Sequence, residues 1–198
     1  MGGVYGIRSD YNGYGNLELT TWLDENEQPM DSGYGYAKIY YDYDLSNSEQ
    51  MELYYESYQD ENGDLTRANN GAWGRQTRYY TATRIYEITY TDQTGDPVMT
   101  TDGYALYEYE VDEHGHVTWE GYYDDTETPV NCKDGYASVE HSYDDQGRLI
   151  GERFLDRYNK LTNNNDGVAG WNGYYDESGE LVISSMYDEE RNPVVVNG

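Results

Sequence analysis

The sequence is poor in the side chains that usually build a protein core. It contains one phenylalanine, four tryptophans and five methionines, its mean hydropathy is −1.01, and its net charge is −27. Low hydropathy combined with high net charge is typical of disordered chains. The 26 tyrosines oppose that interpretation, because a tyrosine ring buries apolar area while its hydroxyl stays in water. We therefore expect a folded but thin structure whose side chains all lie near solvent.

Basic residues and cysteine are also scarce. Lysine and arginine together number 12 against 39 acidic residues. Nucleic acids and anionic membrane surfaces are bound through cationic patches, so this balance disfavours both as partners. The chain has no apolar run of membrane-spanning length, and we expect no membrane insertion. Because Cys132 is the single cysteine, no disulfide framework is possible, and we interpret it as an ordinary thiol.

Repetition is what the sequence has in abundance. A glycine and an aspartate each recur at steps of 32 residues, with one step of 36 in each series. The glycines are Gly3, Gly35, Gly71, Gly103, Gly135 and Gly167, and the aspartates are Asp24, Asp60, Asp92, Asp124, Asp156 and Asp188. A fixed period in this range predicts one supersecondary unit copied in tandem. The predicted units are roughly 2–33, 34–69, 70–101, 102–133, 134–165 and 166–197, and we expect the chain to be part of a longer protein.

The fifth unit shows the predicted structure of each copy. Residues 136–143 alternate in character, with Val139, His141 and Tyr143 on one side. Residues 144–147 read Asp-Asp-Gln-Gly, and a second apolar stretch follows at 148–155. Two such runs around Asp-x-x-Gly predict a β-hairpin, because Asp opens a type I turn and Gly takes the left-handed position after it.

The second unit is four residues longer between its glycine and its aspartate than the others. Insertions are tolerated at exposed hairpin tips, so we assign the extra residues to the polar stretch 44–50. Proline or leucine stands five residues after each repeated aspartate, as at Pro29 and Leu65. Proline lacks an N–H group, so this position is expected in a turn or an edge segment.

Three columns of the repeat are predicted to form the core, because stacked copies bury what one hairpin leaves exposed. They are Leu17, Leu53, Ile85, Val117, Leu149 and Leu181; Trp22, Tyr58, Tyr90, Tyr122, Phe154 and Met186; and Tyr11, Tyr43, Tyr79, Val111, Tyr143 and Tyr175. The predicted fold class is all-β, with six tandem hairpin repeats of ~32 residues stacked into an elongated, solenoid-like array.

The turn and aromatic residues of these units carry a resemblance. Stretches such as 176–181 (Asp-Glu-Ser-Gly-Glu-Leu) and 187–195 resemble Tyr/Asp/Gly-rich repeats of bacterial (Firmicutes) cell-envelope proteins, appended to glycerophosphotransferase-like or glycosyltransferase-like proteins. Residues 173–179 are more distantly similar to the hairpin repeats of choline- and cell-wall-binding proteins. The units here are longer than those repeats and lack their regular Gly-Trp opening. The resemblance implies a bacterial cell-surface location, or a cytoplasmic one beside a polymer-synthesising transferase.

Catalytic and metal chemistry find little support in the sequence. Asp60, Asn62 and Asp64 have the spacing that opens a calcium loop, but the distal glutamate is missing, so turn chemistry is the favoured interpretation. His114 and His116 lack a third ligand for zinc. Near-identical copies single out no acid/base pair. We expect no catalytic residue, no metal and no cofactor.

Exposed aromatic side chains are the candidate ligand-binding residues. Tyrosine and tryptophan beside carboxylates can stack on sugar rings or surround a quaternary ammonium group. The candidates are Trp73, Trp119, Trp171, Tyr109 and Tyr175, and the competing interpretation is that such rings simply form the core.

The basic residues of the third unit form a local cluster. Arg67, Arg75, Arg78 and Arg84 lie within eighteen positions. We favour ion pairs with acidic residues on neighbouring strands over a ligand site.

The sequence thus predicts a non-catalytic module of a bacterial envelope protein that binds a neutral or cationic glycan or envelope polymer through tyrosine, tryptophan and carboxylates. The alternative is a structural spacer or stalk that has no ligand and self-associates through its repeat edges.

Overall fold

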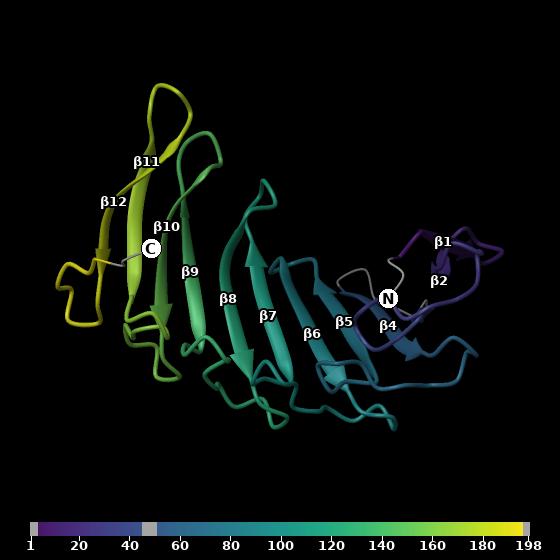
Figure 1. Ribbon diagram of the computed structural model, residues 1–198. Coiled ribbons are helices and arrows are strands. Elements are labelled where there is room, and N and C mark those ends of the chain that lie inside the picture. The colour runs from purple at the N-terminus through teal and green to yellow at the C-terminus, as the bar shows by residue number, and fades with distance from the viewer. Residues whose placement is uncertain (1–3, 45–50, 196–198) are drawn as a thin grey trace. The chain divides into compact units, whose positions relative to one another are not determined.

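The computed structural model describes residues 4–44 and 51–195, which are all-β (Figure 1). These ranges contain twelve strands and no helix. They therefore contain no helix that could cross a membrane. The strands are β1 (Gly6–Tyr11), β2 (Leu17–Leu23), β3 (Lys38–Tyr43), β4 (Met51–Gln59), β5 (Gly74–Tyr80), β6 (Ile85–Thr91), β7 (Leu106–Val111), β8 (Val117–Tyr123), β9 (Ser138–Tyr143), β10 (Leu149–Leu155), β11 (Gly170–Tyr175) and β12 (Leu181–Tyr187). The predicted all-β array of hairpins is confirmed.

The chain divides into two compact units. Unit 1 comprises Met1–Ala82 and Glu87–Thr101, and unit 2 comprises Thr83–Tyr86 and Asp102–Gly198. Strands β1 to β5 belong to unit 1 and β7 to β12 to unit 2, while β6 contributes residues to both.

Consecutive strands form the predicted antiparallel hairpins. In unit 1, β1 pairs with β2 and β3 with β4, and in unit 2 β7 pairs with β8, β9 with β10, and β11 with β12. In the fifth repeat Val139 lies opposite Phe154 and His141 opposite Glu152, as alternation of side chains requires. The insertion assigned to the second hairpin tip falls on 45–50, outside the described residues.

Neighbouring hairpins within each unit join through a backbone ladder. β2 pairs with β3 and β4 with β5 in unit 1, and β8 pairs with β9 and β10 with β11 in unit 2. One bond recurs at all four junctions: the N–H two residues before the repeated aspartate donates to a carbonyl of the next hairpin. Its pairs are Trp22 to Ala37, Tyr58 to Trp73, Tyr122 to Ala137 and Phe154 to Ala169, at 2.8–3.0 Å. Each hairpin therefore covers the open backbone edge of the one before it.

One five-residue turn occurs three times in a repeat. The N–H of its first residue donates to the carbonyl of its fifth, and the N–H of its fourth donates to the carbonyl of its first. In the fifth repeat these turns begin at Asp144, Asp156 and Asn164. Each of these side chains also accepts backbone N–H bonds through Oδ1, at 2.8–3.0 Å. The repeated aspartates are thus turn-forming acceptors.

The same turn explains the repeated glycines and prolines. The glycine column occupies the fourth position of the third turn, where φ is +88° at Gly35 and +98° at Gly135. Pro29 and Pro193 lie in isolated bridges just after the second turn, opposite Leu23 and Tyr187. The residue after each proline donates the hydrogen bond instead, as Val194 does to the carbonyl of Met186. The predicted edge position of proline is confirmed.

The core is thin and lies where the connecting loops fold over one end of the strands. In unit 1 Ile39, Tyr58, Ala68 and Ala72 are buried together, and in unit 2 Val139, Phe154 and Val168 are. The ring of Tyr36 stacks on Tyr58, and that of Tyr136 on Phe154, each with centroids 4.6 Å apart. The predicted column that contains Tyr58 and Phe154 is therefore part of the core. The prediction is wrong for the columns of Leu181 and Tyr11, whose described members are half-buried or exposed, because they lie toward the hairpin tips and away from the connecting loops.

The left-handed glycine column supplies a test of the turn. A Cβ on Gly167 would meet no atom within 4 Å, but φ there is +77°. Gly167→Ala should therefore lower the free energy of unfolding by about 1 kcal/mol through backbone strain alone. Gly13→Ala is the matched control, because it also has open space and lies outside the left-handed region. Urea unfolding followed by circular dichroism measures both, and equal stability of the two variants would contradict this account of the turn.

Candidate functional site

A row of polar side chains crosses five strands on one face of unit 2. The hydroxyl of Tyr107 donates to Glu120, whose other oxygen lies 2.7 Å from His141 Nε2. His141 Nδ1 lies 3.3 Å from Glu152 Oε1, close enough for an ion pair but not aligned as a hydrogen bond. The indole N–H of Trp171 donates to Glu152 Oε2 at 2.7 Å. These five residues, which we call the His141 row, come from β7, β8, β9, β10 and β11.

The hairpin geometry places this row. Glu120 and Glu152 stand two residues before Tyr122 and Phe154, so they share the face on which those rings pack. Tyr109 lies opposite Glu120, and Trp171 lies opposite Glu152 across the junction between hairpins. The row therefore exists only because the second strand of one hairpin meets the first strand of the next.

Charge within the row is fixed by mutual contacts. Burial lowers the pKa of His141, but the hydrogen bond to Glu120 and the close negative charges of Glu120 and Glu152 outweigh burial and raise that pKa to about 9. Contact with His141 is also the main reason that the pKa of Glu152 is lowered. For Glu120, burial raises the pKa, and the bonds from His141 and Tyr107 lower it further than burial raises it. At neutral pH the row thus holds one imidazolium between two carboxylates.

A cleft of about 230 Å³ opens beside the row. Glu120, His141 and Glu152 form one part of its lining, and the rings of Tyr136 and Phe154 form another. Two successive third turns complete it with Asp134 and with Asn164, Asn165 and Asp166. The turns are linked, because Asn165 N–H donates to the carbonyl of Asp134 and its side chain donates to the carbonyl of Lys133. The lining combines carboxylates, amides and aromatic rings.

The preceding repeat has a smaller cleft in the same place. Its volume is about 180 Å³, and Asp102, Tyr104, Tyr122, Cys132, Lys133 and Asp134 line it. Tyr104 and Tyr122 occupy the repeat positions of Tyr136 and Phe154, 32 residues earlier. Asp102 likewise corresponds to Asp134, and its carboxylate lies 2.6 Å from Lys133 Nζ. An acidic and aromatic cleft therefore recurs in two consecutive hairpins of unit 2.

The two glutamates of the His141 row do not form the acid/base pair of a glycoside hydrolase. A glycoside hydrolase uses one protonated and one ionised carboxyl group. Here the pKa values of Glu120 and Glu152 are both lowered by the same histidine, so both remain ionised. Carboxylates, amide oxygens and aromatic rings together can accept hydrogen bonds from a polyol and attract a cationic group.

The structure does not bring the five candidate binding residues together. Trp171 belongs to the His141 row, and Tyr109 stacks on Tyr86 with centroids 4.7 Å apart. Tyr175 lies under the guanidinium of Arg148, which is 4.1 Å from the ring centroid. Trp119 lies against Gly121 on the opposite face from Glu120.

Trp73 belongs to unit 1, where its backbone N–H and carbonyl join neighbouring strands. All five candidate rings are half-buried. Each could offer a ligand only part of its surface.

Three of the four arginines of the third-repeat cluster lie in unit 1, and Arg84 belongs to unit 2. Arg75 makes two 2.8 Å bonds to the buried Glu56, and Arg78 pairs with Glu87. Arg67 donates to the carbonyl of Gly71 at 2.9 Å. The expected pairing with acidic neighbours is confirmed for Arg75 and Arg78.

In the part of the chain that the structure describes, no three His, Cys, Asp or Glu side chains are placed to hold one metal ion. The oxygens of Asp60 accept from the N–H groups of Asn62 and Asp64. His116 pairs with Asp112 and stacks on Tyr143 with centroids 4.8 Å apart.

Sequence reasoning missed the glutamates of the His141 row, although a signal for them exists. The predictions rest on repeat positions whose residue type is similar in all copies, whereas Glu120 and Glu152 stand at a position whose residue type differs between copies. That position holds Thr20, Glu56, Ile88, Glu120, Glu152 and Ser184. A glutamate in two successive copies, with a histidine on the strand between them, predicts a buried ion pair once the hairpins are placed side by side.

Comparisons with known proteins do not assign the chain to a family. No protein-family model matches the chain, and a search of curated proteins finds no significant match.

The charge of His141 predicts a pH dependence of stability. Because its folded-state pKa of about 9 exceeds its usual 6.5, the stabilisation is complete below pH 6.5 and is lost as the pH rises to about 9. The shift corresponds to on the order of 3 kcal/mol. The free energy of unfolding, measured in urea across this window, should fall for the native chain and change much less for His141→Gln.

His114→Gln is the matched control, because His114 is an exposed tip residue. It should keep the pH dependence of the native chain. Identical profiles for the two histidine variants would contradict the assigned charge.

Proposed function

We propose that the chain is a non-catalytic binding module that contacts a neutral or cationic polymer through the two neighbouring clefts of unit 2. One observation carries the proposal: the same residue columns line an acidic, aromatic cleft in two consecutive hairpins. A surface that repeats along the chain suits a ligand that also repeats. A glycan or substituted polymer of the bacterial envelope has that character.

The spacing of the clefts supports a polymeric ligand. Adjacent strands lie roughly 4.8 Å apart, so equivalent positions in consecutive hairpins are separated by two strands, or about 10 Å. This distance is close to the length of two linked sugar rings. A chain of such units laid across the strands would present the same groups to each cleft in turn.

The charge of the clefts defines the ligand class. Asp134 and Asp166 lie at the turns, and Glu120 and Glu152 lie at the row. An anionic polymer backbone would be repelled by this lining and by the net charge of −27. Hydroxyl groups, amino sugars and choline or alanyl substituents carry the donors or positive charge that these carboxylates attract.

A passive spacer is the second candidate function. It is favoured by the internal engagement of the aromatic rings: Trp171 donates to Glu152, Tyr109 stacks on Tyr86, and Tyr175 lies under Arg148. Rings used in this way strengthen the sheet whether or not a ligand exists.

Binding to an array of neutral, amino-substituted, choline-substituted and anionic glycans separates the two functions. We expect cationic and neutral members to bind and anionic ones not to. The Asp134→Asn/Asp166→Asn double variant should weaken binding of the cationic members about tenfold, because it removes two carboxylates from the cleft.

Asp145→Asn/Glu177→Gln is the matched control, since it removes two charges from exposed hairpin tips of the same unit. Its binding should remain that of the native chain. Absence of binding across the whole array, or an equal effect of both double variants, would leave the spacer as the better description.

A further inference from the structure

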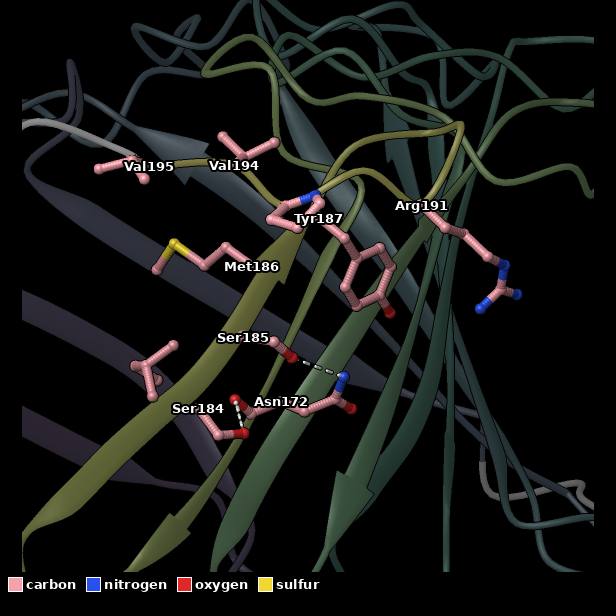
Figure 2. A pocket seen from close by; sticks show the side chains of 10 residues that line it. Asn172, Ser184, Ser185, Met186, Tyr187, Arg191, Val194 and Val195 are labelled. Carbon is pink, nitrogen blue, oxygen red and sulfur yellow. Dashed lines mark hydrogen bonds between the residues drawn. The ribbon is translucent and has the colours of Figure 1, made fainter.

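The open edge of β12 carries a groove in unit 2. Its volume is about 710 Å³, and Ile183, Ser184, Met186, Pro193, Val194 and Val195 are among the residues that line it. Figure 2 shows Met186, Val194 and Val195 gathered on one side of the β12 ribbon. Among the described residues, β12 has one neighbouring strand, β11. The groove therefore combines apolar side chains with polar ones, among them Asn172, Ser185 and Arg191, beside an unpaired strand edge.

The equivalent surface one hairpin earlier is covered. Phe154 occupies the repeat position of Met186, and its N–H donates to the carbonyl of Ala169 at 2.8 Å. The side chain of Phe154 is buried together with Val168. The segment that leads into β11 thus supplies both a backbone acceptor, at Ala169, and an apolar cover, from Val168, for β10.

The first repeat presents the matching surface. Val4, Tyr5 and Ile7 occupy the repeat positions of Val168, Ala169 and Trp171, 164 residues earlier. Their exposed fractions are 43%, 75% and 60%, although their counterparts in the sixth repeat are buried or half-buried. Strand β1 also has one neighbour among the described residues, β2. The apolar side chains of Val4, Tyr5 and Ile7 therefore face solvent in the part of the chain that the structure describes.

We propose that β12 of one copy of this chain pairs with β1 of a second copy, in the antiparallel register that joins neighbouring hairpins within each unit. The β10–β11 ladder, transferred by the repeat period, places the pairs. They are Ile183 with Arg8, Ser184 with Ile7 and Ser185 with Gly6, and Met186 N–H donates to the carbonyl of Tyr5. The contact is head-to-tail, so each copy uses its β12 edge toward one neighbour and its β1 edge toward another.

Net charge sets the conditions under which this association forms. At −27 the copies repel one another, and the repulsion is screened by salt. The local contact consists of backbone hydrogen bonds and side chains that, apart from Arg8, are uncharged, so salt weakens the repulsion more than the contact. Association should therefore strengthen as ionic strength rises. Edges that are held apart only by net charge would show the same salt dependence.

A pair of substitutions at one position tests the register against net charge. Ile183→Lys places a lysine opposite Arg8, and Ile183→Glu places a glutamate there. The lysine variant lowers the net negative charge but should associate at least about fivefold more weakly than the glutamate variant. Net charge alone predicts the reverse order. Sedimentation velocity over a concentration series, at low and high ionic strength, measures both.

Charge exchange and mixing test the identity of the two edges. Arg8→Glu combined with Ile183→Lys should restore association.

Ile7→Lys leaves the β12 edge intact, whereas Ile183→Lys leaves the β1 edge intact. Neither variant should associate alone, and a mixture of the two should form a one-to-one dimer. Tyr14→Lys is the control, because Tyr14 is 87% exposed at a hairpin tip, and it should associate as the native chain does.

Several outcomes overturn the proposal. A native chain that is monomeric at high ionic strength rules out the contact. Self-association of either single edge variant shows a symmetric pairing of like edges instead. A lysine variant that associates more strongly than the glutamate variant shows that net charge, not this register, governs association. None of these results bears on glycan binding, which depends on the cleft beside His141.

Discussion

A two-stranded hairpin in water has too few neighbours to bury its own side chains, and this constraint shapes the whole chain. Within each unit a hairpin gains stability by pairing its second strand with the first strand of the next, as Phe154 does with Ala169. That junction also brings Val168 onto Phe154. Backbone pairing and burial therefore come from the same contact. Tyrosine suits such a thin sheet, because Tyr58 can pack on Tyr36 while few described side chains are far from water.

The turns hold the hairpins in register and require only a few residue types at fixed positions. One five-residue geometry serves three times in a repeat, with a side-chain oxygen of Asp or Asn accepting backbone N–H bonds. Hydrogen bonds of this kind also lower the pKa of Asp24 and Asp60, so these exposed carboxylates stay ionised. Much of the acidity of the chain is thus turn chemistry. The same charges that shape each loop also contribute to the electrostatic repulsion between copies.

The junctions between hairpins are also where chemistry concentrates. Unit 1 places Arg75 against Glu56, and unit 2 places His141 between Glu120 and Glu152. Both arrangements join the second strand of one repeat to the first strand of the next. A cation in that position neutralises carboxylates that would otherwise be buried without a partner. The clefts of unit 2 open at the same junctions, so stability and the proposed binding share one structural origin.

The sequence by itself determined the local structure. The Asp-x-x-Gly tips, the glycine column and the prolines each specify a backbone conformation within a few residues, so the hairpins could be predicted. The tertiary structure alone decided the site. Whether the indole of Trp171 is free or bonded to Glu152 depends on the register between two hairpins, which no single repeat encodes. His141 looks like an ordinary strand residue until the preceding copy brings Glu120 to the side of it opposite Glu152, which is in its own hairpin. Contacts across a junction combine residues far apart in the chain, and only packing selects them.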